Sequence, residues 1–305
     1  MELSQKLSGG KSISNLKRQE WLLFLALVLP NLLLFFIFNY YPLFFNTYLS
    51  FTFWDMLSPI KVWVGLDNYL KLFTDKNFIT IITNTFYFSG ASVLSTTILG
   101  LLTALLLNQP LRYRNAVRSA VFAPTVLSGA AIGIVWIYIL DPRFGILANV
   151  LGVVGIPSPK WLTTTEWAMP AVIMVYAWKN MGYSTVIFLA GLKAIPPELY
   201  EAALVDGADW VNRFRHVTLP GLSPIIFFLV LTNTLASFQA FDIIKIMTDG
   251  GPVNATNTLV YYLYEQGFIA FSAGKAGVAA VLMFVMMFIF TVLQFRYSER
   301  HVHYS

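Results

Sequence analysis

The sequence predicts an all-α integral membrane protein with six transmembrane helices, and three observations carry this prediction. Charged residues make up only 11% of the 305 residues, against about 25% in an average soluble protein. Hydrophobic residues make up 57% and the mean hydropathy is +0.66. The chain also contains six apolar stretches near the ~20 residues that a helix needs to cross a bilayer. This composition excludes a disordered chain and argues against a soluble enzyme.

The six stretches contain almost no charge, because only Lys179, Asp242 and Lys245 interrupt them. The first is too long for a signal peptide, whose apolar region has ~7–15 residues, and no small-x-small cleavage site follows it. We therefore interpret all six as membrane spans. They are Trp21–Tyr41, Phe86–Leu107 within the uncharged stretch Asn77–Leu111, Ser119–Leu140, Ala168–Leu192, Gly221–Ile246 and Ala276–Phe295.

The basic residues predict the orientation of these spans. The two termini and the loops 108–118 and 193–220 hold 12 Lys and Arg residues, whereas the three other, longer loops hold 6. Basic residues concentrate on the cytoplasmic side, so both termini are expected there, and the net charge of +5 indicates topology rather than nucleic-acid binding. The expected organisation is a cytoplasmic segment 1–19, a first transmembrane helix 20–42, an extracytoplasmic loop 43–76, a transmembrane core 77–296 and a cytoplasmic tail 297–305.

Several chemistries are excluded by what the sequence lacks. There is no cysteine, which excludes disulfides, thiolate metal sites and cysteine nucleophiles. Two of the three histidines, His301 and His303, lie in the last five residues, which argues against a buried metal centre. No phosphate-binding Gly-x4-Gly-Lys-Ser/Thr loop is present, so the chain is not expected to hydrolyse ATP.

The loop 193–220 is the most informative segment of the sequence. Pro197 suits the first position of a helix, Glu201 follows in that helix, and Gly207 is placed to end it. Asp209 is placed to cap a second short helix, Trp210–His216. The segment thus predicts a helix-turn-helix fixed at both ends to spans. It is either a passive connector or a rigid docking element for a cytoplasmic partner, and its tethering beside the bilayer excludes DNA binding.

The same loop carries a family resemblance. Glu201, Ala202 and Ala203, then Gly207, then Val217-x-Leu219-Pro220, resemble the EAA signature of permease subunits of binding-protein-dependent ABC importers, with Val217 where the family usually has Ile. The outer segment 63–69, the Gly-Gly-Pro at 250–252 and the C-terminal 294–304 are similar to the carbohydrate-uptake branch, and especially to the first permease subunit of glycerol-3-phosphate and sugar importers.

This resemblance implies the type I ABC importer permease fold, in a multi-pass protein of the cell inner membrane surrounded by lipid. The partners it implies are a second homologous permease, two ATPase subunits that use ATP and Mg, and an extracytoplasmic solute-binding protein, but no nucleic acid. No cofactor is expected on this chain itself. The residues expected to couple it to the ATPase are Glu201, Ala202, Ala203, Gly207, Leu219 and Pro220.

Polar residues inside the fourth and fifth spans form two candidate faces of a substrate path. Asn180 lies 13 residues before Lys193 and Asn233 lies 13 residues after Pro220, which places both amides ~20 Å from the inner surface. These faces could bind a polyol, or they could instead hydrogen-bond one helix to another. The residues concerned are Tyr176, Asn180 and Tyr183, with Lys179 beside them, and Asn233 and Ser237.

Three charged residues in the spans leave alternatives open. Lys179 could attract an anionic solute, snorkel, or pair with a carboxylate on another span. Asp242 and Lys245 are spaced for a local ion pair or a gate contact. A stand-alone secondary transporter would require more embedded carboxylates than Asp242 alone, and a membrane enzyme would require a His/Asp/Glu cluster. The solute itself is not determined by the sequence.

Overall fold

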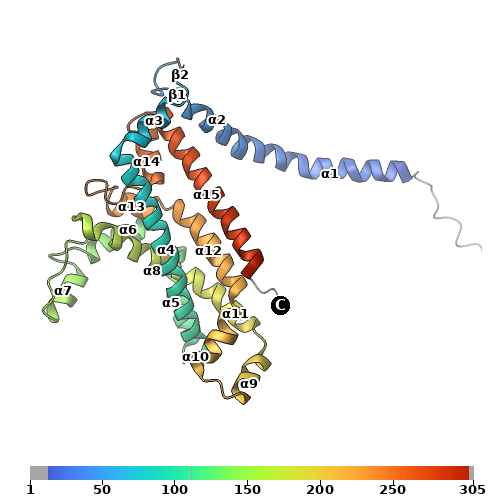
Figure 1. The fold of residues 1–305 in the computed structure, drawn as a ribbon, viewed down its shortest axis with the longest axis vertical. Coiled ribbons are helices and arrows are strands. Elements are labelled where there is room, and N and C mark those ends of the chain that lie inside the picture. Colours follow the sequence, from blue (N-terminus) through green and yellow to red (C-terminus); the bar gives the residue numbers. More distant parts are fainter. Residues whose placement is uncertain (1–12, 111, 302–305) are drawn as a thin grey trace, which may run out of the picture.

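The computed structural model describes residues 13–110 and 112–301 and is mostly helical (Figure 1). Its elements in chain order are α1 (Ile13–Phe35), a π-helical turn (Phe36–Tyr40), α2 (Tyr41–Ser50), β1 (Thr52–Phe53), β2 (Val62–Trp63), α3 (Asp67–Thr74), α4 (Lys76–Asn108), α5 (Arg114–Val126), α6 (Gly129–Ile139), α7 (Ile146–Val153), α8 (Thr165–Ala194), α9 (Pro197–Val205), α10 (Trp210–Arg213), a second π-helical turn (Phe214–Thr218), α11 (Leu219–Gly221), α12 (Ser223–Phe238), α13 (Asp242–Met247), α14 (Leu259–Tyr264), a third π-helical turn (Glu265–Ile269) and α15 (Ala273–His301).

The first helical segment stands apart from the body of the molecule. Figure 1 shows α1 extending away from α4, α8, α12 and α15, which form the body. The most apolar window of the continuous segment Glu20–Ser50 has no buried residue, whereas α2 at its end packs against α15. The helix runs to Ser50 and so continues past the Tyr41 at which the sequence analysis ended the first span. The antiparallel pair β1–β2 and α3 then fold over the N-terminal end of α15.

Three helical segments among the described residues are long and apolar enough to cross a membrane: Glu20–Ser50, Lys76–Asn108 and Ala273–Arg296. The number rises to five if each of two sharply bent helix pairs counts as one span. The 30-residue helix α8 does not qualify, because Lys179, Asn180 and other polar residues in its middle lower its mean hydropathy. The structure thus supports a helical membrane protein with three to five candidate spans.

The third predicted span, Ser119–Leu140, is not one straight helix. It is divided between α5 and α6, which are bent by 104°. Pro124 near the end of α5 has no N–H for a helical hydrogen bond, and Leu127 and Ser128 adopt extended ψ angles of 148° and 135°. The sequence did not predict this break, because hydropathy does not register it, and the two helices count as one span only if the bent pair crosses the membrane together.

The fifth predicted span, Gly221–Ile246, is also interrupted. The helical segment Trp210–Gly221 meets α12 at a 64° bend, where Pro220 and Pro224 disrupt helical hydrogen bonding. At its other end α12 stops at Phe238, and the chain resumes a helix only in α13. Since α13 packs against α6, the two interrupted spans contact each other through the segments beyond their breaks.

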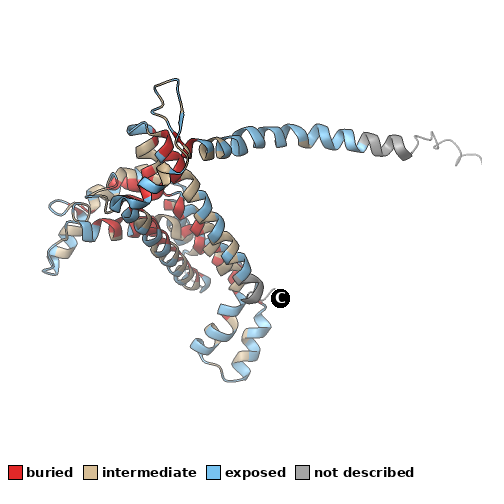
Figure 2. Ribbon diagram, turned by 45° about the horizontal axis from the view of Figure 1, so that its top comes forward, coloured by how far each residue is buried: buried red, intermediate tan, exposed pale blue. Residues whose placement is uncertain are grey.

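The buried residues gather where α4 and α8 cross the other helices, as the red segments in Figure 2 show. One cluster joins α8 to α6 and α13 and includes Phe88, Val172 and Ile244. A second joins the C-terminal ends of α4 and α8 to the start of α12 and includes Phe188 and Leu222. A third joins α3, α4, α14 and α15. The ends of the loop 193–220 that lie nearest the body of the molecule pack against the second cluster.

Candidate coupling hairpin and polar helix contacts

The loop 193–220 forms a helical hairpin, whose first arm is α9. Pro197 occupies a first-turn position, where its missing N–H costs no hydrogen bond, and Glu198 lies in the same turn, where a carboxylate complements the helix dipole. Glu201, Ala202 and Ala203 follow in the same arm, and no residue of α9 is buried. This arm therefore presents Glu201 and Ala202 on an exposed surface.

The chain reverses at Gly207, as the sequence predicted. Gly207 has φ of +75°, a conformation that glycine adopts without the steric cost that a Cβ brings. The Ala208 N–H donates to the Ala203 carbonyl at 2.8 Å, and the Gly207 N–H donates to the Leu204 carbonyl at 3.1 Å. These two bonds are the Schellman arrangement that ends a helix with glycine. The reversal is therefore fixed by its own backbone.

The second arm begins at Asp209, as predicted. Its carboxylate accepts a hydrogen bond from the Asn212 N–H at 2.8 Å and caps α10. The arm does not end at the predicted His216, because a π-helical turn and α11 continue it to Gly221. Leu219 and Pro220 are exposed near this end. Pro220 cannot donate a backbone hydrogen bond, so a wider helical turn before it is a common adjustment.

The two arms are joined across their base. The Tyr200 hydroxyl on α9 lies 3.0 Å from the Thr218 hydroxyl at the end of the π-helical turn. Tyr200 and Val217 pack against the second core cluster, whereas the far part of the hairpin exposes apolar side chains, with Val205 89% and Trp210 63% exposed. An exposed face with apolar and acidic residues on a locally fixed backbone is suited to docking another protein.

The predicted path residues on α8 differ in their surroundings. Tyr176 is buried with its ring edge against Phe88, at 5.2 Å between centroids. The Asn180 amide donates to the Tyr176 carbonyl at 2.9 Å, within its own helix. Tyr183 is 36% exposed. Lys179 is half-buried and forms no ion pair with any residue that the structure describes.

On α12, the predicted residue Asn233 joins three helices. It is buried, and its amide donates to the Ser184 hydroxyl on α8 at 3.2 Å and to the Thr97 hydroxyl on α4 at 3.4 Å. Ser237, also buried, donates to the Thr234 carbonyl of its own helix. The structure thus brings Asn233 to α8 through Ser184 rather than through Asn180.

Sequence reasoning missed Ser184, Thr97 and the glycine that lets them meet. At Gly100 on α4 an added Cβ would lie 2.5 Å from the Ser184 Cβ, so the two helices approach each other more closely than any side chain at position 100 allows. Small residues at such a crossing are typical of membrane helices. A glycine preceded by Ser95, Thr96 and Thr97 inside an apolar stretch was the available signal.

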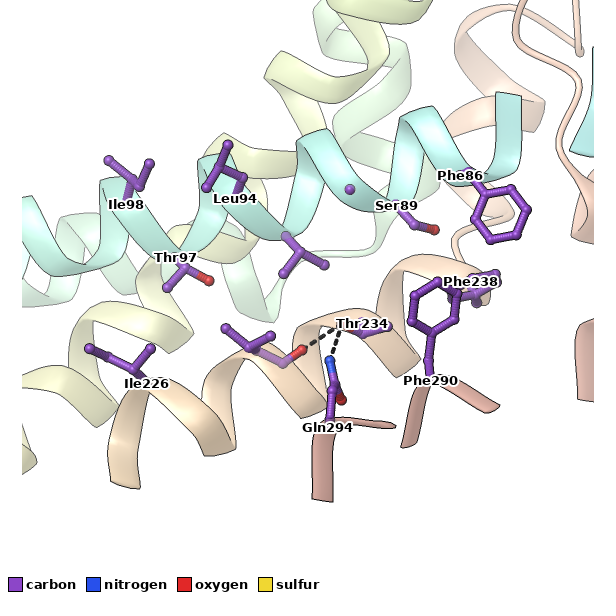
Figure 3. A pocket seen from close by; sticks show the side chains of 13 residues that line it. Phe86, Ser89, Leu94, Thr97, Ile98, Ile226, Thr234, Phe238, Phe290 and Gln294 are labelled. Carbon is purple, nitrogen blue, oxygen red and sulfur yellow. Dashed lines mark hydrogen bonds between the residues drawn. The ribbon is translucent and has the colours of Figure 1, made fainter. Parts of the chain in front are cut away.

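A cavity of about 520 Å³ lies on the other side of this crossing, between α4, α12 and α15 (Figure 3). Its wall is mainly apolar, and Figure 3 shows the Gln294 amide donating to the Thr234 hydroxyl, at 3.3 Å. None of the six predicted path residues lines it. Among the described residues no group of three or more His, Asp or Glu side chains is arranged to hold a metal ion.

The predicted ion pair between Asp242 and Lys245 is not formed. The Lys245 ammonium lies 2.6 Å from Asp249, four residues away in the direction that the chain takes after α13. The Asp242 carboxylate instead lies against Gly129 at the start of α6. Hydrogen bonds from Lys245, and secondly from Tyr261 at 2.8 Å, hold the pKa of the Asp249 carboxyl below its ordinary value.

Comparisons with known proteins agree with the architecture. The family model described as binding-protein-dependent transport system inner membrane component matches residues 96–303. The chain is 34% identical, over 94% of its length and 97% of the relative's, to the sn-glycerol-3-phosphate transport system permease protein UgpA of Yersinia pestis. It is also 34% identical to UgpA of Agrobacterium fabrum, over 92% of this chain and 95% of that protein.

Among solved structures, a bacterial ABC transporter involved in the import of the acidic polysaccharide alginate has a chain with a TM-score of 0.81 and 28% identity, covering 94% of this chain and 98% of that chain. A second structure of the alginate transporter, in complex with an alginate pentasaccharide-bound periplasmic protein, matches with a TM-score of 0.80 and 28% identity, over 93% of this chain and 96% of that chain.

Fold, hairpin and comparisons together define the membrane-spanning subunit of an ATP-driven importer. The chain belongs to the family of binding-protein-dependent transport system inner membrane components. It is therefore a multi-pass inner-membrane permease, the transmembrane rather than the catalytic component of its ABC importer. The family predicted from the EAA signature is confirmed, whereas the roles assigned to individual residues stay predictions.

Proposed function

We propose that this permease forms half of a translocation path whose other half is a second, homologous permease. Two ATPase subunits drive transport with ATP and Mg, and an extracytoplasmic binding protein delivers the solute. In this proposal the chain adopts the type I importer topology with six spans and cytoplasmic termini. The three long apolar segments, the bent pair α5–α6, α8 and α12 supply the six.

The observation that carries the proposal is the position of the hairpin. It connects the end of α8 directly to α12, and its base is packed against the C-terminal end of α4. A force applied to the exposed residues of α9 and α10 therefore reaches three helices of the body. In this proposal Glu201, Ala202, Ala203 and Gly207 contact the ATPase, and Leu219 and Pro220 pass the motion to α12.

The proposed path follows α8 and α12. Tyr176, Asn180 and Tyr183 line it on α8, Asn233 and Ser237 line it on α12, and Lys179 adds a positive charge. We propose an anionic polyol or sugar derivative as solute, because the matched relatives are named for sn-glycerol-3-phosphate and the matched structure for an acidic polysaccharide. The Lys179 ammonium forms no ion pair with a described residue, and a positive charge inside the membrane favours an anionic solute.

The test is transport by the whole complex. The permease is co-expressed with its cognate ATPase, second permease and binding protein, purified and placed in proteoliposomes. We expect the ATPase to co-purify and ATP to drive uptake of labelled sn-glycerol-3-phosphate in preference to glycerol or maltose. Absence of the ATPase from the purified complex would contradict the coupling role. An assembled complex that transports only neutral sugars would contradict the solute assignment alone.

Topology has a separate test. A reporter enzyme that is active only outside the cytoplasm is fused after Ser305. Because the positive-inside rule places this end in the cytoplasm, the fusion is expected to be inactive, while the same reporter inserted in the loop 141–167 is expected to be active. An active C-terminal fusion would contradict the six-span topology.

A further inference from the structure

We infer that Tyr200 and Thr218 are positioning residues in the proposed coupling hairpin, the loop 193–220. Their hydrogen bond holds the two arms of this hairpin in one fixed arrangement. Their hydroxyl groups form a 3.0 Å hydrogen bond between residues 18 positions apart, and this bond joins the first arm to the second. The inference rests on the proposed coupling role of the hairpin and adds to it the device that keeps the two arms together.

The direction of this bond follows from its neighbours. The Thr218 hydroxyl also lies 3.5 Å from the Arg213 carbonyl, which can accept its proton. The Thr218 oxygen is then left to accept the proton of the Tyr200 hydroxyl. Thr218 is only 5% exposed, and Tyr200 packs against the core cluster at the base. The Thr218 side of the bond is therefore shielded from water, whereas the Tyr200 side borders a groove beside α4.

The hairpin needs this bond because its arms have little other tertiary packing. Neither α9 nor α10 has a buried residue, and the described bonds at the tip are local ones, the backbone bonds of the reversal and the Asp209 cap. A groove of about 620 Å³, lined by Leu106, Tyr200 and Trp210 among others, separates the hairpin from the end of α4. Without the Tyr200–Thr218 bond, α9 could tilt into this groove independently of α10, and motion imposed on α9 would not reach α12.

The test compares variants that remove one hydroxyl and little else. Tyr200→Phe and Thr218→Val each break the bond at nearly constant volume, Thr218→Ser keeps it, and Tyr113→Phe removes an exposed hydroxyl elsewhere in the cytoplasmic half. Spin labels are attached at Leu204→Cys and Val211→Cys, one on each arm, in the assembled complex. The natural chain has no cysteine, so this chain carries labels only at these positions when it is labelled before assembly with its partners.

Two quantities are measured with and without ATP: the distribution of the interspin distance, and the stimulation of ATP hydrolysis by the cognate binding protein. We expect a narrow distribution and full stimulation for the wild type, Thr218→Ser and Tyr113→Phe. Tyr200→Phe and Thr218→Val are expected to broaden the distribution and to lower stimulation at least about threefold, which corresponds to roughly 0.7 kcal/mol of lost coupling. The double variant is expected to be no worse than either single variant, because both remove the same bond.

The inference is overturned if both hydroxyl-deleting variants keep the narrow distribution and the full stimulation. It is equally overturned if Thr218→Ser behaves like Thr218→Val, because a variant that keeps the hydroxyl would then fail as well, and the effect would come from altered packing at position 218 and not from the lost bond. These outcomes are separable from failure of the proposed function. If variants at Gly207 and Glu201 also leave stimulation unchanged, the hairpin does not couple at all. If those variants lower the stimulation of ATP hydrolysis while Tyr200→Phe does not, the hairpin couples transport to ATP hydrolysis, but the Tyr200–Thr218 bond is not needed for it.

Discussion

The helical hairpin 193–220 and the helix crossing at Asn233 both place polar residues in an apolar protein. Bonds between residues close in sequence hold the hairpin, whereas bonds between distant residues hold the crossing. In the hairpin, the stop at Gly207 and the cap at Asp209 are hydrogen bonds between residues at most five positions apart. At the crossing, Asn233 reaches partners 49 and 136 residues away. Local rules therefore fix the hairpin backbone, whereas tertiary packing fixes the crossing.

This difference separates two kinds of function. The hairpin does not need neighbours to keep its backbone, so its outer face is free to bind a partner. The crossing is buried and its polar groups already bond one another, so a solute that used Asn233 would have to compete with Ser184 and Thr97. The predictions below test this comparison, from the largest expected effect to the smallest.

The largest effect is expected from two single variants, Gly207→Val and Glu201→Lys. A β-branched residue at φ of +75° costs about 1–2 kcal/mol in this backbone region, and the lysine reverses a charge on the proposed docking face. Both variants should insert normally, since no span changes. Binding-protein-stimulated ATP hydrolysis should fall about tenfold, or the ATPase should fail to co-purify.

The chain offers a matched control for the glycine. Gly155 also has φ of +75° with open space around its Cα, but it lies in the loop after α7. Gly155→Val therefore brings the same local strain without touching the hairpin, and it should leave stimulation unchanged. If Gly207→Val and Glu201→Lys hydrolyse ATP and co-purify like this control, the hairpin is a passive connector.

The next effect is expected at the crossing, where two asparagines are compared. Asn233→Leu removes both of its bonds to α4 and α8, each worth ~0.6 kcal/mol in membrane proteins, and should lower both the thermal stability of the complex and solute uptake. Asn180→Leu removes only a bond within α8, so it should leave stability nearly unchanged. Labelled uptake and thermal unfolding in detergent measure the two quantities.

A substrate role and a structural role give different results in this pair. If both residues line the path, both variants lose uptake severalfold, and Asn180→Leu does so without losing stability. If the asparagines serve only helix packing, Asn180→Leu transports like the wild type and the uptake loss of Asn233→Leu follows its lost stability. Normal uptake by both variants would remove them from the path.

The distinction between local bonds and tertiary packing also explains which features could be predicted from the sequence. The start of the hairpin at Pro197, its stop at Gly207 and its cap at Asp209 follow from local backbone chemistry and were predicted correctly. The bends in the third and fifth spans were not, because hydropathy measures apolar length and does not register the break at Leu127–Ser128 or the stop at Phe238.

Contacts between distant residues were also out of reach. The partner of Lys245 depends on how the chain turns after α13, and Asp242 and Asp249 are both within its reach along the sequence. Similarly, matched depth placed Asn180 and Asn233 at one level, but only the rotation of α8 decides that Ser184, and not Asn180, meets α12. Depth follows from residue counting, whereas rotation follows from the packing at Gly100.

A smaller and selective effect is expected at Lys179. Lys179→Met removes the one charge of α8 between its ends, so uptake of a phosphorylated solute should fall about three- to tenfold while a neutral polyol, if transported, is unaffected. Lys179→Arg keeps the charge and should keep most uptake. Competition between sn-glycerol-3-phosphate and glycerol in proteoliposomes measures the selectivity, and an equal loss for both solutes would assign Lys179 to structure.

The smallest effect is expected at Asp249, the exposed counterpart of the buried polar contacts. Its side chain is 66% exposed, so its pair with Lys245 should contribute less than ~1 kcal/mol. Because the folded protein holds the pKa of Asp249 below its ordinary value of 3.8, this contribution is present above that value and is lost as the pH falls through the lower folded value. Asp249→Asn should therefore lower the unfolding temperature slightly at pH 7, with the difference shrinking as the pH falls below about 4 and as salt is added.

Asp67→Asn is the matched control, since Asp67 forms an equally spaced 2.6 Å pair with a more exposed lysine, Lys71, and lacks a tyrosine like Tyr261 as a second donor. If Asp249→Asn destabilises the protein no more than this control, the Tyr261 hydrogen bond adds nothing to an ordinary surface ion pair. A difference that persists unchanged below the folded pKa would show that Asp249 acts by packing and not by charge.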